Sequence, residues 1–83
     1  MITVRYFANL KTIAGKEEEQ FDLGNETSLD RLCEEINKSA PNLGDMVREN
    51  KIRVSVNMDV VPFDTIIHDG DEVALLPPFS GGI

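Results

Sequence analysis

The sequence has no tryptophan and only one cysteine and one histidine. The single cysteine, Cys33, cannot form a disulfide within the chain, which favours a reducing compartment. A nucleophilic pair would need Cys33 and His68 to meet, and a zinc site needs more soft ligands than these two residues supply. These shortages favour an adaptor, a carrier or a subunit over an enzyme with its own catalytic centre.

Basic residues and long apolar runs are also scarce. Fifteen acidic residues against eight basic ones give a net charge of −7. This charge argues against binding nucleic acid or an anionic membrane surface, since both would repel the chain, and it suits a basic protein partner. No apolar run approaches the roughly 20 residues of a membrane span, and the first ten residues lack the positive segment of a signal peptide. We therefore expect a cytoplasmic protein.

The 83 residues are enough for one small domain but not for two hydrophobic cores. Alternation of apolar and polar residues predicts several strands. Acidic residues in the second strand and Pro62 at the end of the fourth are typical of sheet edges or strand ends. The expected strands are residues 2–8, 18–23, 52–57, 60–62 and 72–76.

One longer helix is predicted after Thr27 or Ser28, either of which can act as its N-cap. Its apolar stripe, spaced i, i+3, i+4 and i+7, consists of Leu29, Leu32, Cys33 and Ile36. Cys33 is therefore expected to be a small buried apolar residue. The helix should end before Pro41, and shorter helical pieces are expected at residues 10–14 and 43–47.

These elements predict a two-layer α+β domain with one main helix on a mixed sheet of four or five strands. The helix and the sheet would share a single core. Its expected members are Ile2, Val4, Tyr6, Leu29, Leu32, Ile36, Val54, Val56, Val73 and Leu75.

The least ordinary segment follows the last strand and reads Pro77-Pro78-Phe79-Ser80-Gly81-Gly82-Ile83. The two prolines stiffen its base, and the glycines leave its end without bulk. Fully extended, this segment reaches about 20 Å. We expect a domain at residues 1–76 and a slim tail at residues 77–83 that can enter a narrow channel in another protein.

In these features the chain resembles the small subunits of molybdopterin synthases (MoaD-like), within the ubiquitin-like sulfur-carrier group that also includes ThiS. The segments that carry the resemblance are residues 7–10 (FANL), 14–15 (AG), 56–57 (VN), 69–74 (DGDEVA) and 77–82 (PPFSGG). The last two are the specific part, and the double proline favours the molybdopterin branch over the thiamine branch.

The resemblance implies a β-grasp fold with the first and last strands adjacent and parallel. It also implies a mechanism without a bound cofactor or a catalytic centre in this chain. An E1-like enzyme (MoeB-like) would use ATP to adenylate the carboxylate of Gly82, and sulfur would replace AMP to give a thiocarboxylate. The large synthase subunit (MoaE-like) would then receive the tail, and the sulfur would pass to a cyclic pyranopterin to build a dithiolene.

The chain departs from the family pattern at its last residue, because Ile83 holds the Gly82 carboxylate in a peptide bond. Three explanations stay open. A peptidase trims Ile83, or Ile83 is an artefact of the recorded sequence, or the chain keeps Ile83 and only binds partners. We favour trimming.

A docking surface is predicted from apolar residues that alternation places on the side of a strand opposite its core residues. Phe7 and Leu76 would share one face if the first and last strands are neighbours, and Val60 would join them. The resemblance places the contacts with the synthase and the E1-like enzyme on this face. The other expected partner-binding residues belong to the tail: Pro77, Pro78, Phe79, Ser80 and Gly81.

Other functions share these features. A ubiquitin-like protein modifier would use the same activated glycine to form isopeptide bonds with target lysines. A β-grasp interaction module that retains Ile83 would bind partners without carrying sulfur. Sulfur carriers of the thiamine or cysteine pathways are variants of the leading hypothesis.

Overall fold

The structure, a computed structural model, describes residues 1–77. Its helices are α1 (Leu10–Ala14), α2 (Leu29–Ser39) and α3 (Leu43–Arg48). Its strands are β1 (Ile2–Tyr6), β2 (Glu18–Phe21), β3 (Glu26–Ser28), β4 (Arg53–Val56), β5 (Asp59–Val60), β6 (Ile66–His68) and β7 (Glu72–Leu76). None of the helices in this range is long and apolar enough to cross a membrane.

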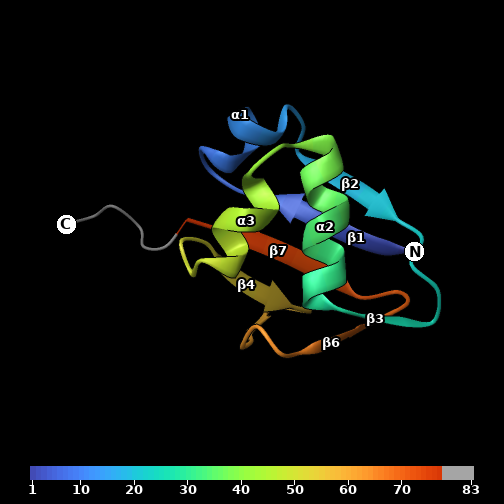
Figure 1. The fold of residues 1–83 in the computed structure, drawn as a ribbon. Helices are drawn as coiled ribbons and strands as arrows, with labels where there is room; N and C mark the ends of the chain where they lie inside the picture. The colour runs from blue at the N-terminus through green and yellow to red at the C-terminus, as the bar shows by residue number, and fades with distance from the viewer. Residues whose placement is uncertain (78–83) are drawn as a thin grey trace.

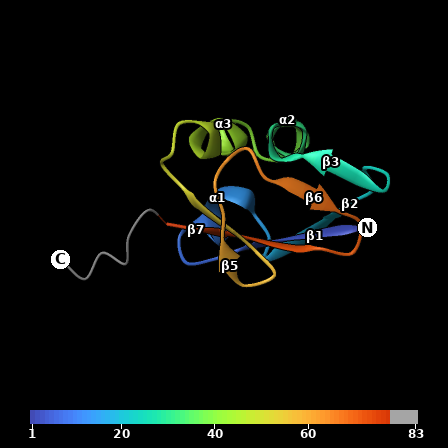
Figure 2. The same ribbon diagram turned by 90° about the horizontal axis from the view of Figure 1, so that it is seen from below.

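Five strands form a mixed sheet in the order β2-β1-β7-β4-β5 (Figure 1). β1 and β7 are neighbours and run parallel, whereas the other neighbouring pairs are antiparallel. Figure 2 shows α2 and α3 on one side of this sheet. The expected α+β architecture is confirmed, with the parallel first and last strands of a β-grasp fold. The acidic second strand lies at an edge, as predicted.

Several strands are shorter than their patterns predicted, and backbone conformation explains two of the ends. Ala8 has a φ of +54°, in the left-handed region, so β1 ends at Tyr6 rather than at residue 8. Asn57 has a φ of +50° and belongs to the turn after β4. The alternation of apolar and polar residues in the sequence continues through such residues. A prediction based on this alternation therefore makes the strands too long.

A small second sheet, formed by β3 and β6, was not predicted. Thr27 lies opposite Ile67 in this antiparallel pair. Three residues are too few to display a period, so neither strand was visible in the sequence. Ser28, the last residue of β3, is the N-cap of α2, because its Oγ accepts a hydrogen bond of 3.0 Å from the backbone N–H of Arg31. The cap expected at Thr27 or Ser28 is therefore Ser28.

The predicted core is confirmed except at Val56, which is only partly buried at the end of β4. The core is also larger than expected, because both short helices and the β3–β6 sheet contribute to it. The further buried apolar residues are Leu10, Ala14, Cys33, Ala40, Leu43, Val47, Ile52 and Ile67. Cys33 is fully buried, as its place in the helix stripe predicted.

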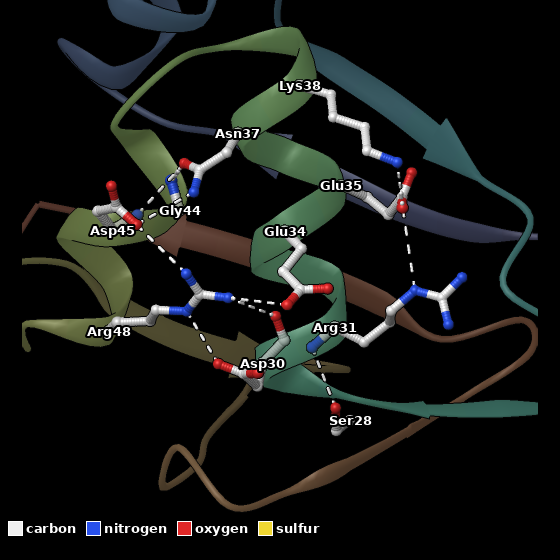
Figure 3. Close-up of polar contacts among 10 residues, drawn as sticks. All are labelled: Ser28, Asp30, Arg31, Glu34, Glu35, Asn37, Lys38, Gly44, Asp45 and Arg48. Atoms are coloured by element: carbon white, nitrogen blue, oxygen red, sulfur yellow. Dashed lines mark hydrogen bonds and ion pairs between the residues drawn. The ribbon is translucent and has the colours of Figure 1, made fainter.

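Arg48 joins α3 to α2 through several acidic side chains (Figure 3). Its Nε lies 2.8 Å from Asp30 Oδ1, and its two other nitrogens lie 3.7 Å from Glu34 Oε2 and 3.3 Å from Asp45 Oδ1. Its guanidinium also donates to the backbone carbonyl of Asp30. A planar group with several donors can hold all of these oxygens at once, which a lysine could not do.

Asn37 of α2 caps the start of α3. The residue before α3 makes no side-chain cap hydrogen bond of its own. The Oδ1 of Asn37 instead accepts from the backbone N–H of Gly44 at 2.8 Å and of Asp45 at 3.3 Å, and its Nδ2 donates to Asp45 Oδ1 (Figure 3). The first N–H groups of a helix lack partners within the helix, so Asn37 fixes where α3 sits on α2.

Candidate docking face

The side of the sheet opposite α2 and α3 carries the residues that are out of phase with the core. Strand register places Arg5, Ala74, Ser55 and Val60 in one row across β1, β7, β4 and β5. Residues that lie opposite each other share a face. The next row holds Leu76, and the Phe7 N–H donates to the carbonyl of Leu75 at 3.2 Å, which extends the β1–β7 pairing.

This face contains a hollow of about 300 Å³. Its lining residues are Arg5, Phe7, Ser55, Met58, Glu72, Ala74 and Leu76. Phe7 is 37% exposed although it is a large aromatic residue, and Leu76 is partly buried. Phe7 and Leu76 thus lie on one face, as their phase in the two strands indicated. Their role in docking stays a prediction.

Val60 shares the face but not the hollow. It lies on β5, opposite Ser55 and at the edge of the sheet, and it is 65% exposed. Val60 lines a second hollow, of about 190 Å³, together with Pro62 and Phe63. The structure thus brings Phe7 and Leu76 together and sets Val60 apart from them.

The charges around the larger hollow are paired. An Arg5 nitrogen lies 3.6 Å from Glu72 Oε2 and another lies 4.0 Å from Glu18 Oε1, and the guanidinium carbon is 5.6 Å from the centre of the Phe7 ring. All three charged side chains are about half exposed, so each ion pair contributes little stability. They leave a hollow without a strong net charge, suited to an apolar group.

A hydrogen-bonded clamp that sequence reasoning missed holds one end of this face. Asn57 donates from Nδ2 to Asp71 Oδ1 at 3.0 Å, and its Oδ1 accepts from the Glu72 N–H at 3.0 Å. The other Asp71 oxygen accepts from the His68 N–H at 2.8 Å. Asn57 and Asp71 both lie in segments that carried the family resemblance, which was the available signal.

The clamp changes the acidity of Asp71. The hydrogen bond from the His68 N–H lowers the pKa of this carboxyl below its ordinary value of 3.8. Burial acts in the opposite direction, and the bond from Asn57 lowers the pKa further. The ionised form is therefore favoured in the folded state.

We predict a pH-dependent cost for the Asp71→Asn variant. A lowered folded-state pKa stabilises the fold above pH 3.8, and this contribution is lost as the pH falls through the folded-state pKa. At pH 7 the variant should melt at a lower temperature than the wild type, and the gap should narrow as the pH falls below 3.8. Thermal unfolding across this range measures the gap. A difference in melting temperature that stays constant with pH would contradict a lowered pKa of Asp71 in the folded state.

Comparison with known proteins places the chain in a family. The ThiS family model matches residues 4–82, which is nearly the whole sequence. The chain belongs to the ThiS family. The tail residues named above from Pro78 to Gly82 lie within this match, and they lie outside the residues that the structure describes.

Relatives of this ThiS-family chain include proteins with named roles. It is 36% identical to the molybdopterin synthase sulfur carrier subunit of Chlamydomonas reinhardtii, over 98% of both chains. It resembles the structure of a putative molybdopterin converting factor subunit 1 from Pyrococcus furiosus, with a TM-score of 0.75, 28% identity, and coverage of 94% of this chain and 97% of that one. It also resembles small archaeal modifier protein 1 of Methanosarcina acetivorans, with a TM-score of 0.74, 26% identity, and coverage of 98% and 95%.

The only thiol of this ThiS-family chain is Cys33, and it is placed where it cannot act as a nucleophile. Burial raises its pKa to about 11, and Arg48, which acts to lower it, only partly offsets this. The thiol is thus protonated at neutral pH, and no solvent reaches it. Within residues 1–77 no group of three or more histidine, cysteine or acidic side chains can hold a metal ion.

We predict that Cys33 is unreactive in the folded protein. At pH 8, a thiol-specific chromogenic reagent should leave the native chain unmodified during the time in which it fully modifies the chain in denaturant. The native and denatured rates, measured side by side, check this. Fast modification under native conditions would place the thiol at the surface.

Proposed function

We propose that this chain is a sulfur carrier, the small subunit of a molybdopterin synthase. The observation that carries the proposal is that the tail with its two glycines follows directly on β7, a strand of the docking face. Leu76 lines the hollow, and Pro77, the next residue, begins the tail. A partner seated on the hollow is therefore within the roughly 20 Å reach of Gly82. The Chlamydomonas relative favours the molybdopterin pathway over those of thiamine and cysteine.

The chemistry would take place at the Gly82 carboxylate. One carboxylate oxygen attacks the α-phosphate of ATP, pyrophosphate leaves, and an acyl adenylate forms on an E1-like (MoeB-like) enzyme. Hydrosulfide, the simplest sulfur source, then attacks the acyl carbon, AMP leaves and a proton is released, which gives a thiocarboxylate. In the large subunit (MoaE-like), that sulfur displaces an oxygen substituent from a carbon of a cyclic pyranopterin precursor, and water then cleaves the resulting thioester and returns the Gly82 carboxylate. ATP is consumed on the activating partner, and this chain supplies no bound cofactor and no catalytic side chain.

Removal of Ile83 must come first, because the Gly82 carboxyl is otherwise part of a peptide bond. A trimming peptidase that cleaves after Gly82 would expose it. The described fold ends its last strand at Leu76, so such cleavage leaves every strand intact.

The intact mass of the protein from its native cells tests the proposal. The mass is measured before and after incubation with an E1-like enzyme, ATP and a sulfur source. We expect the loss of Ile83, and then a gain equal to the difference in mass between sulfur and oxygen. A chain that keeps Ile83 and never gains mass would be a β-grasp interaction module instead.

Phe7→Asp should weaken binding to the large subunit by more than about tenfold. A carboxylate in the hollow must be desolvated when a partner covers it, whereas Phe7 offers an aromatic surface. The melting temperature should change little, because Phe7 already contacts solvent. Titration calorimetry measures the affinity, and Ile66→Asp is a matched control, since Ile66 is 46% exposed and lines no part of this hollow. A large loss of thermal stability would instead place Phe7 in the core.

A second function is favoured by the resemblance to the modifier protein of Methanosarcina acetivorans. As a protein modifier, the chain would pass its activated Gly82 to a lysine amine and form an isopeptide bond. Immunoblots with an antibody against this chain distinguish the two functions. High-mass conjugates that survive denaturation and vanish in a chain lacking Gly82 would support modification.

A further inference from the structure

The turn between β4 and β5 has an unusual sequence for its conformation. Val56 pairs with Asp59, so Asn57 and Met58 form a two-residue hairpin turn. Their φ angles are +50° and +76°, which identifies a type I′ turn. Asn is common at the first of these positions, whereas the second strongly favours glycine. A residue with a long apolar side chain, such as Met58, is therefore unfavourable for the backbone conformation of this turn.

Contacts with residues at the start of β7 hold this turn in place. Asn57 is bonded through its side chain to Asp71 and Glu72, and its backbone N–H donates to the Glu72 carbonyl at 2.8 Å. These contacts tie the turn to the start of β7, a strand with neighbours on both sides. A conformation that is costly for Met58 thus persists because its surroundings impose it.

Met58 contributes little to the stability of the domain. It is 90% exposed, more than any other large apolar residue in the described range. Away from the docking face, Met1 is 57% exposed, and Ile13 and Ile66 are each 46% exposed. Yet Met58 lines the hollow together with Phe7, Ala74 and Leu76. Its side chain therefore extends the apolar surface of the hollow outward into solvent.

We propose that Met58 is an anchor for the large synthase subunit, lying against an apolar side chain that the partner inserts into the hollow. This inference rests on the function proposed above. A partner that receives Gly82 at the end of a tail of roughly 20 Å comes close to the surface around Leu76, which borders the same hollow. The paired charges of Arg5 and Glu72 leave the hollow suited to an apolar group. A flexible, polarizable thioether adapts its shape to such a group.

Three substitutions separate the side chain from the turn. Met58→Gly suits the positive φ and removes the side chain, Met58→Gln keeps the length but adds polarity, and Met58→Leu keeps the apolar character. Calorimetry with the full chain and the large subunit from the same organism measures affinity. We expect Met58→Gly and Met58→Gln to bind about tenfold more weakly, and Met58→Leu to stay within about twofold of the wild type. Ile66→Gln, away from the hollow, should bind as the wild type does.

The thermal midpoint supplies the second readout. Met58→Gly should melt at or above the wild-type temperature although it binds more weakly, because glycine relieves the turn. Equal affinity of Met58→Gly and the wild type would overturn the anchor and leave the carrier function standing. Met58 variants that bind only the E1-like enzyme more weakly, and the large subunit as tightly as the wild type does, would also overturn the anchor. A wild-type chain that binds no large subunit would overturn the carrier function, and the anchor with it.

Discussion

The Gly44→Ala variant is expected to lose about 3 kcal/mol of stability, the upper end of the usual cost of overpacking an interior. A Cβ at this position would lie 2.2 Å from the Cys33 carbonyl oxygen, 2.9 Å from the carbonyl carbon and 2.8 Å from Asn37 Oδ1. Two of these atoms are backbone of α2, which cannot move aside without shifting the helix. The melting temperature should fall by more than about 10 °C for a domain of this size.

The Gly44→Ala substitution has two effects on stability, and they have opposite signs. Their relative sizes decide whether the variant is more or less stable than the wild type. Gly44 lies inside α3, where alanine is intrinsically better than glycine by about 1 kcal/mol. Propensity alone would therefore predict a more stable variant. The clash with Cys33 outweighs this gain, because α3 can accommodate a methyl group only by moving off α2 and losing its cap from Asn37.

Gly24→Ala is the matched control. It makes the same chemical change at a glycine whose φ is +83° and whose Cβ would meet no atom within 4 Å. Its cost should be limited to the strained backbone, about 1 kcal/mol. Urea or thermal unfolding of both variants measures the difference. A Gly44→Ala variant as stable as the wild type would mean that α3 does not sit this close to α2.

Gly82→Ala is expected to slow sulfur transfer by on the order of 100-fold while leaving the fold intact. A methyl group beside the reacting carboxyl would obstruct a close-fitting channel and displace the sulfur from its acceptor. The described domain ends before Gly82, so thermal unfolding should match the wild type. Single-turnover transfer from thiocarboxylated protein to the precursor, with excess large subunit, measures the rate.

Gly24→Ala is the control for this experiment too, because it adds the same methyl group at a glycine of the described domain, outside the tail. Its transfer rate should stay close to that of the wild type. Wild-type transfer by Gly82→Ala would mean that the tail need not be slim at its end. A rate loss in both variants would mean that the loss comes from a weakened fold and not from the tail.

The sequence predicted the main elements of the fold because their patterns are long enough to have a period. The stripe Leu29, Leu32, Cys33 and Ile36 spans two turns of helix, and its burial is confirmed. Alternation along β1 and β7 also fixed which residues face away from the helices. Alternation thus placed Phe7 and Leu76 on one face, together with the adjacency of those two strands, which the family resemblance implied.

Other features depend on contacts that a linear pattern does not contain. β3 and β6 have three residues each and pair across about 40 positions of sequence, so Ile67 was missing from the predicted core. The cap of α3 comes from Asn37 in another helix. The clamp between Asn57 and Asp71 joins two turns, and the unusual place of Met58 is evident only from its φ and its exposure.

The central position of β7 has a mechanical consequence. A partner that grips the tail and releases it pulls on β7 along its own axis. Hydrogen bonds to β1 and β4 run across that axis on both sides, so the load falls on two ladders at once in shear instead of opening them one bond at a time. A strand at the edge would peel away under the same pull. The domain should therefore resist a pull along β7 better than a domain whose last strand lay at the edge of the sheet.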